Sequence, residues 1–181
     1  TAVYAGIFEH AGDYSIRSAD GSAISFEIME KYGAGRLILN SAVNTTTLKV
    51  MDAASISGAG ALTVDTLELH ADLTTGLAVD VTSISNGGAY TWTLDGSERE
   101  FSQKLSREQL ASVKEVRVEG KATLDMTTST TSTDAVTFTV SNISGDGTLA
   151  LNLGKNHSNK LAISDKFGGT THVMNGWFTL N

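Results

Sequence analysis

Short runs of alternating apolar and polar residues recur along this chain and predict β-strands. The clearest runs are 23–28, 62–69, 90–94, 136–140 and 149–153. Strict alternation over four to eight residues is the signal of a strand with one buried face. The runs are rich in Val, Ile, Thr and aromatic residues, and clusters of Gly, Asn, Asp or Ser separate them. We therefore expect many short strands joined by tight turns.

A glycine-led phrase occurs three times and indicates a repeat. It reads Gly-x-Gly, then apolar residues two and four places after the second glycine, then Asn or Asp, over 33–40, 58–65 and 145–152. Looser copies follow Gly12, Gly88, Gly120 and Gly169, so consecutive anchors lie 22 to 32 residues apart. Repeats of about 20–50 residues are typical of solenoids, propellers and arrays. These intervals hold two or three strands, too few for a propeller blade but enough for one turn of a β-helix.

We therefore predict an all-β fold, a right-handed parallel β-helix (β-solenoid) of about seven rungs, formed by residues 1–181 as a single segment. In this scheme the equivalent apolar residues of the phrase are buried and stack on one another: Leu37, Leu39, Leu62, Val64, Leu149 and Leu151. Tyr14, Tyr90 and Trp92 share this inward parity, whereas Trp177 has the outward parity.

Two segments depart from the strand pattern. Residues 97–114 predict a short helical excursion, with Ser106 as the N-cap and Leu105, Leu110 and Val113 as one apolar stripe. The excursion is either a surface embellishment that covers the core or a binding face, because solenoid insertions often gather on the binding side. Residues 127–133, all Thr or Ser, predict a polar outward turn.

Composition excludes some classes of function. The net charge of −7 argues against nucleic-acid binding, which normally requires a basic patch. No apolar stretch approaches the 18 residues of a membrane span. Proline is absent, as suits strands paired on both sides that cannot lose an N–H. Cysteine is also absent, so disulfides cannot contribute to stability. The chain begins without Met and stops within an apolar strand at 176–181, so we expect a piece of a longer protein.

The search for chemistry yields no catalytic, cofactor-binding or metal-binding residue. The four histidines lack metal-ligand spacing, and nucleophile and phosphate-loop motifs are missing. An Asn or Asp ends several predicted strands (Asn40, Asp65, Asp95, Asp125 and Asn152). These residues could stack into the acidic column of a polysaccharide-degrading enzyme, or each could cap its own turn. Two dense polar groups, Glu9–Asp13 and Asp95–Glu100, are interpreted as solvated turns.

The C-terminal third resembles a known family. The phrases Gly-Asp-Gly-Thr-Leu-Ala-Leu-Asn-Leu at 145–153, Asn-Lys-Leu-Ala-Ile-Ser at 159–164 and Gly-Gly-Thr-Thr-His-Val-Met at 168–174 resemble the pertactin-like passenger domains of bacterial autotransporters. The resemblance implies a right-handed parallel β-helix at the surface of, or secreted by, a Gram-negative bacterium. It carries over no functional residue, because the shared motif is structural.

The expected function is therefore a stalk or display segment of an adhesin, without chemistry or cofactor of its own. Expected partners are host glycans or surface proteins, with self-association through exposed rung ends and neither nucleic acid nor membrane insertion. We expect residues Thr1–His10 to fold over the first rung and partly cover its end. We expect no segment of this chain to cover the last strand in the same way. Two alternatives stay open: a β-helical polysaccharide-degrading enzyme or tailspike-like protein, and a carbohydrate- or protein-binding module that uses 97–114.

Overall fold

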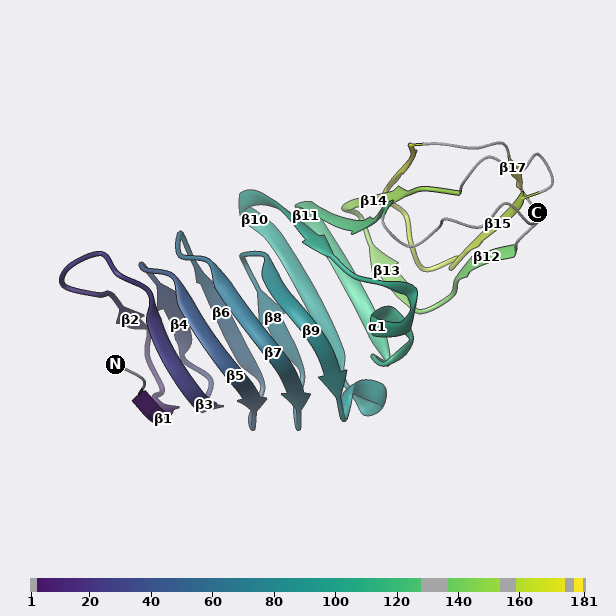
Figure 1. Ribbon diagram of the computed structural model, residues 1–181. Helices are drawn as coiled ribbons and strands as arrows, with labels where there is room; N and C mark the ends of the chain where they lie inside the picture. The colour runs from purple at the N-terminus through teal and green to yellow at the C-terminus, as the bar shows by residue number, and fades with distance from the viewer. Residues whose placement is uncertain (1–2, 128–136, 154–158, 175–177, 181) are drawn as a thin grey trace.

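The computed structural model shows a parallel β-solenoid of about seven turns (Figure 1). It describes residues 3–127, 137–153, 159–174 and 178–180. Every pairing between the described strands is parallel, as required when each turn of the chain stacks on the preceding one. The predicted β-helical fold class is confirmed.

Three sheets form the sides of the solenoid. Sheet A is ordered along the axis as β1 (Val3–Glu9), β3 (Ile24–Tyr32), β5 (Val43–Val50), β7 (Leu62–Leu69) and β9 (Val79–Ser85). Sheet B is ordered as β2 (Tyr14–Ile16), β4 (Arg36–Leu39), β6 (Ala54–Gly58), β8 (Leu73–Thr75), β10 (Thr91–Lys104), β11 (Glu115–Met126), β14 (Thr148–Leu151) and β16 (Thr170–Val173). A further short strand, β13 (Ile143–Gly145), pairs with β11. Sheet C contains β12 (Thr137–Val140), β15 (Asn159–Ile163) and β17 (Phe178–Leu180).

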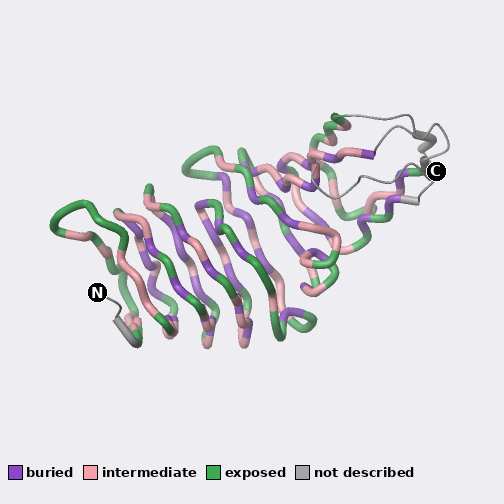
Figure 2. Tube along the Cα trace, in the orientation of Figure 1, coloured by how far each residue is buried: buried purple, intermediate pink, exposed green. Residues whose placement is uncertain are grey.

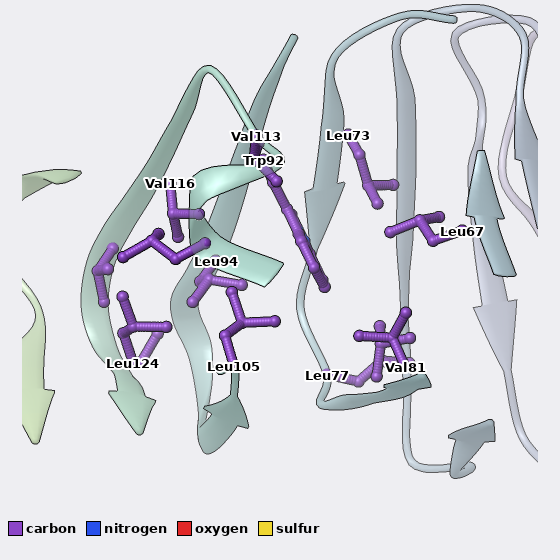
Figure 3. Close-up of a cluster of buried hydrophobic side chains, with 14 of the residues drawn as sticks. Leu67, Leu73, Leu77, Val81, Trp92, Leu94, Leu105, Val113, Val116 and Leu124 are labelled. Atoms are coloured by element: carbon purple, nitrogen blue, oxygen red, sulfur yellow. The ribbon is translucent and has the colours of Figure 1, made fainter. Parts of the chain in front are cut away.

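The interior is a continuous column of apolar side chains between the sheets. All six residues predicted to be inward are at most 1% exposed. Figure 2 shows that buried positions recur along successive strands of the solenoid. In the close-up of Figure 3, Leu73 and Trp92 project into this interior from the paired strands β8 and β10 of sheet B, and Leu67 projects from β7 of sheet A. The Trp92 indole donates to Thr75 Oγ1 at 2.9 Å, so its polar atom is satisfied inside the core.

The rung register differs from the register that the glycine phrase suggested. Leu37 pairs with Ile56 in sheet B, nineteen residues on, whereas Leu62 pairs with Val43 in sheet A. Leu37 and Leu62 are therefore both buried but lie in different sheets, and the prediction that they stack as equivalents is wrong. Local alternation decides which side of a strand is buried, whereas the turn lengths decide which strands become neighbours.

The first rung also corrects the expected N-terminal shield. Val3–Glu9 is itself the first strand of sheet A, with Phe8 in register with Lys31. The Phe8 ring packs at 5.8 Å against Phe26 in a T-shaped arrangement. Tyr14 has the predicted inward parity, in register with Leu37, but is 51% exposed because no described strand lies beyond it. The segment is thus part of the first rung and does not fold over it.

The solenoid changes its cross-section at β10. β10 and β11 pair on both sides of an irregularity between Gly96 and Phe101, so each spans a corner of the solenoid. β9 is followed in the chain by the short 3-10 turn Gly87–Ala89, then by β10 and the helix α1 (Arg107–Ala111). The helix lies beside β9, because Gln109 Nε2 donates to the carbonyls of Val81 and Thr82. The predicted excursion 97–114 is therefore narrower than expected. Residues up to Lys104 belong to a strand, and the helix covers only five residues.

Local sequence explains how α1 begins and packs. Ser106 Oγ accepts the Gln109 N–H at 3.1 Å and the Gln109 side chain accepts the Ser106 N–H at 2.8 Å, which is a capping box. The predicted stripe of Leu105, Leu110 and Val113 is at most 4% exposed. The helix thus closes the core where sheet A ends. Thr128–Thr133 of the predicted polar turn and Trp177 lie outside the described residues.

Candidate functional site

The corner of sheet B holds a hollow lined by polar side chains. On β10 and β11, Asp95 is the register partner of Glu119, and Gly96 is the partner of Gly120. The following turn brings Gly145 beside Val118. Gly145 has φ 98°, and a Cβ on it would lie 2.1 Å from the Val118 carbonyl oxygen. Glycine is therefore required for the corner to pack against the rung before it.

The hollow contains charges of both signs. Its charged side chains are Asp95, Glu115, Glu119, Asp146, Arg117 and Lys166, and the hydroxyls of Ser97 and Ser144 accompany them. Asp95 and Glu119 occupy paired positions on adjacent strands, which lie about 4.8 Å apart, and both side chains face outward. This is the arrangement that a polysaccharide-degrading site on a β-helix requires at minimum.

Each of these carboxylates has a local structural partner. Asp95 Oδ1 accepts the Ser97 N–H at 2.9 Å, and Asp146 Oδ1 accepts the Gly120 N–H at 3.0 Å. Arg117 Nε lies 2.6 Å from Glu119 Oε1. Ser144 Oγ donates to Glu115 Oε1 at 2.5 Å. Asp95 thus holds a turn, Asp146 and Glu115 join neighbouring rungs, and Glu119 pairs with a cation of its own strand.

The acidic column considered from the sequence is not formed. Asp65 lies on the exposed side of β7 in sheet A, whereas Asp95 and Asp125 lie in sheet B at unequal register positions. Asp125 pairs with Lys104 and Ala150, and its Oδ1 accepts the N–H and hydroxyl of Thr127 at 2.9 and 2.6 Å. Asn40 and Asn152 follow β4 and β14. Turn capping, the other interpretation, is confirmed for Asp95 and Asp125.

Residues 97–100 fold back over earlier rungs. Arg36 bridges two acids, Asp13 at 3.0 Å and Glu98 at 2.8 Å. Arg99 Nη1 donates to the Gly58 carbonyl at 2.5 Å. Residues 97–100 are exposed, but they form the irregular part of strand β10 instead of the predicted turn, and they also contact earlier rungs. Glu98 and Asp13 together raise the pKa of the Arg36 guanidinium, Asp13 contributing more.

His10, His70 and the buried Lys31 do not gather with the corner residues. His10 Nδ1 lies 2.6 Å from the Gly12 carbonyl, and its Nε2 has no hydrogen-bond partner. His70 Nε2 lies 2.6 Å from Glu68 Oε1, whereas His157 lies outside the described residues. Lys31 is fully buried and donates to the carbonyls of Tyr32 and Gly33 at 2.5 and 2.8 Å. Burial lowers the pKa of its ammonium group, and the charge of Asp52 opposes this.

Within the described ranges, no three His, Asp or Glu side chains are grouped so that they could hold a metal ion. Nor does any helix there have the length and apolar character needed to cross a membrane. Sequence reasoning singled out Asp95 but missed Glu119, Arg117 and Asp146. These residues come together only through the pairing of neighbouring rungs. The one hint in the sequence was that Glu119 and Asp146 each stand beside a glycine at the corner.

Comparisons with known proteins give no relative. No family model, no curated protein and no solved structure matches this chain. The class of protein shown is therefore that of the parallel β-solenoids, on the evidence of the fold.

Proposed function

We propose that this chain is a structural stalk or display segment of a secreted or surface-exposed bacterial adhesin of the autotransporter type. It acts by its length and stability and has no chemistry of its own. Host glycans or host surface proteins are the proposed partners of the whole adhesin.

One observation supports the proposal: the charged side chains around the continuous apolar core form hydrogen bonds and ion pairs that stabilise the solenoid itself. Three acids of the corner hollow, Asp95, Asp146 and Glu115, stabilise a turn or bridge rungs, and Arg36 links Asp13 to Glu98 across 85 residues of sequence. In a solenoid each turn supports its neighbours, so a rod of this kind is mechanically continuous. The motif shared with autotransporter passengers at 145–174 supports the finer assignment.

Export into the outer medium tests the stalk assignment. The chain would be placed between an epitope tag and an autotransporter translocator, and protease accessibility of the tag measured on intact bacteria. A stalk should be exported, folded and protease-resistant, with the tag exposed. Retention of the chain in the periplasm as a soluble folded protein would contradict the assignment.

One observation favours a second candidate, a polysaccharide-degrading enzyme. Asp95 and Glu119 face outward at paired positions in a hollow that also contains Arg117 and Lys166. A reducing-end assay on a panel of acidic and neutral polysaccharides tests this candidate. The stalk assignment predicts no turnover, whereas activity lost in Asp95→Asn and Glu119→Gln, and kept in Asp65→Asn, would establish the enzyme.

The third possibility, a binding module at 97–114, has less support. Its apolar residues Leu105, Leu110 and Val113 are buried and cover the core. Glu98 and Arg99 contact the solenoid. A glycan array probed with the isolated chain tests it directly, and the stalk assignment predicts no binding by this segment.

A further inference from the structure

Residues 97–100 form an outward strap in the middle of β10. The pairing of β10 with β11 breaks after Gly96 and resumes at Phe101, whereas the gap on β11 is a single residue. All four residues of the strap are exposed, and Phe101 packs again against the core. The chain therefore leaves the sheet and returns to it within four residues.

The contacts of the strap lie on rungs that it does not adjoin. The strap belongs to the fifth rung, formed by β9 and β10, and the preceding strand of sheet B is β8 of the fourth rung. Glu98 instead forms an ion pair of 2.8 Å with Arg36 on β4, in the second rung. Arg99 donates to the carbonyl of Gly58 on β6, in the third rung. Because rungs lie about 4.8 Å apart, Glu98 reaches back about 14 Å along the axis.

Arg36 extends this link to the first rung. Its Nη2 lies 3.0 Å from Asp13 Oδ2, while Nη1 lies 2.8 Å from Glu98 Oε1. One guanidinium thus pairs with two acids, and such a network contributes more than an isolated exposed ion pair. The side chain of Arg36 therefore joins the first, second and fifth rungs.

The strap lies against the outer side of β6. Ser57 alternates with the buried Ile56, so its side chain faces outward, yet Ser57 is only 9% exposed. This burial fits a segment that lies over the sheet at this point, since Arg99 bonds the next residue, Gly58. The strap is therefore folded onto the sheet and does not extend into solvent.

In a solenoid each rung contacts its neighbours, so the opening of one rung is transmitted step by step. We propose that the strap is a salt-sensitive clamp that joins the fifth rung directly to the first three. While Glu98 is paired with Arg36, these rungs open together. Salt that screens the pair releases the strap, and the peptide bond after Arg99 becomes accessible to proteases. This inference is independent of the proposed function.

The test is the rate of tryptic cleavage after Arg99 in the folded chain, followed by mass spectrometry. Arg36→Gln removes the cation of the clamp and leaves the sequence around the cleavage site unchanged. At low salt it should be cleaved about two- to five-fold faster than wild type, as expected for the loss of exposed ion pairs. At about 1 M salt, where the Debye length is about 3 Å, the two rates should be equal.

Arg117→Gln is the matched control, because it removes the cation of another exposed ion pair of sheet B, the pair with Glu119. It should be cleaved after Arg99 at the wild-type rate at every salt concentration. Circular dichroism confirms that each variant is folded. If Arg36→Gln does not fold, Glu98→Gln replaces it, and its cleavage rate is divided by that of a free peptide with the same sequence over 94–104.

Amide hydrogen exchange tests the long-range link. Glu98→Gln should raise the exchange rate in β4, whose Arg36 is 62 residues away in sequence, more than in β8 of the adjoining rung. A larger rise in β8 would mean transmission from rung to rung and would overturn the proposal. Equal cleavage of wild type and Arg36→Gln at low salt also overturns it, as does an equal acceleration by Arg117→Gln or a difference that persists at 1 M salt.

Discussion

The side chain of Gln103 forms hydrogen bonds with both backbone polar groups of Val79. The Val79 N–H donates to Gln103 Oε1 at 2.8 Å, and Gln103 Nε2 donates to the Val79 carbonyl at 2.7 Å. A primary amide offers the same donor and acceptor as a peptide group, so the glutamine replaces one residue of the missing next strand. Gln103 is completely buried, which makes these bonds difficult for water to replace.

Gln103→Ala should therefore lower the free energy of unfolding by about 1–3 kcal/mol, because it leaves buried backbone groups at Val79 without partners. Urea denaturation followed by circular dichroism measures this change. Ser102→Ala, at the exposed neighbouring position, is the control and should change stability by less than about 0.5 kcal/mol. Equal effects at the two positions would mean that the Gln103 amide does not stabilise the edge of β9.

The second prediction concerns the alternation within β14. Leu149 is completely buried and in register with Leu124, whereas the adjacent Thr148 is partly exposed. Leu149→Ala should lower the free energy of unfolding by about 2–5 kcal/mol through lost burial and a cavity in the core. Thr148→Ala should be nearly neutral in the same denaturation experiment. A larger loss for Thr148→Ala would show that the inward parity of β14 is wrongly assigned.

The third prediction compares two glycines. A Cβ at Gly145 would collide with the Val118 carbonyl, and its φ of 98° is unfavourable for any other residue. Gly145→Ala should therefore lower the thermal stability, with about 1–3 kcal/mol from backbone strain alone. At Gly88 a Cβ would meet nothing within 4 Å, so Gly88→Ala should leave the melting temperature nearly unchanged. Indistinguishable melting temperatures for the two variants would be evidence against the tight corner.

The fourth prediction concerns pH. Asp20 Oδ1 accepts hydrogen bonds from the hydroxyls of Ser18 and Ser22 at 2.5 and 2.6 Å and from the Ser22 N–H at 3.0 Å. These bonds favour the ionised form and hold the pKa of Asp20 far below its usual range, the Ser18 hydroxyl contributing most. Because the folded-state pKa is the lower one, the resulting stabilisation is present above the unfolded pKa of about 3.9 and declines as the pH falls further.

Titration of the Asp20 carboxyl carbon by NMR measures this shift. In Ser18→Ala the pKa should rise toward the usual value, because the largest contribution is removed. A Ser18→Ala variant that titrates like the wild type would show that the hydroxyl does not hold the carboxylate.

Features that depend on residues close together in the sequence were predicted correctly, whereas features that depend on distant residues were not. Alternation identified Leu37, Leu62 and Leu149 as buried, because which side of a strand a residue faces depends on its own neighbours. The Ser106 cap was likewise readable, since its partner Gln109 is three residues away. The phrase spacing misassigned the stacking of Leu62, because its glycines introduce a sheet B strand at 33–40 and a sheet A strand at 58–65.

The corner hollow shows the same limit. Asp95 was visible in the sequence as a residue beside a turn glycine, but its partner Glu119 is 24 residues away. That pairing depends on the number of residues taken up by α1 and the turns around it. No local pattern reports that number.

The sequence by itself determined the β-solenoid class, the inward residues of most strands and the helical interruption near Ser106. These follow from periodicity and capping, which act over a few residues. Only the tertiary structure decided which rungs are neighbours, where sheet A ends at the Gln103 and Gln109 side chains, and which carboxylates meet at the corner. The physical reason is that rung register is set by the summed length of every turn in between, so one local irregularity shifts all the contacts that follow.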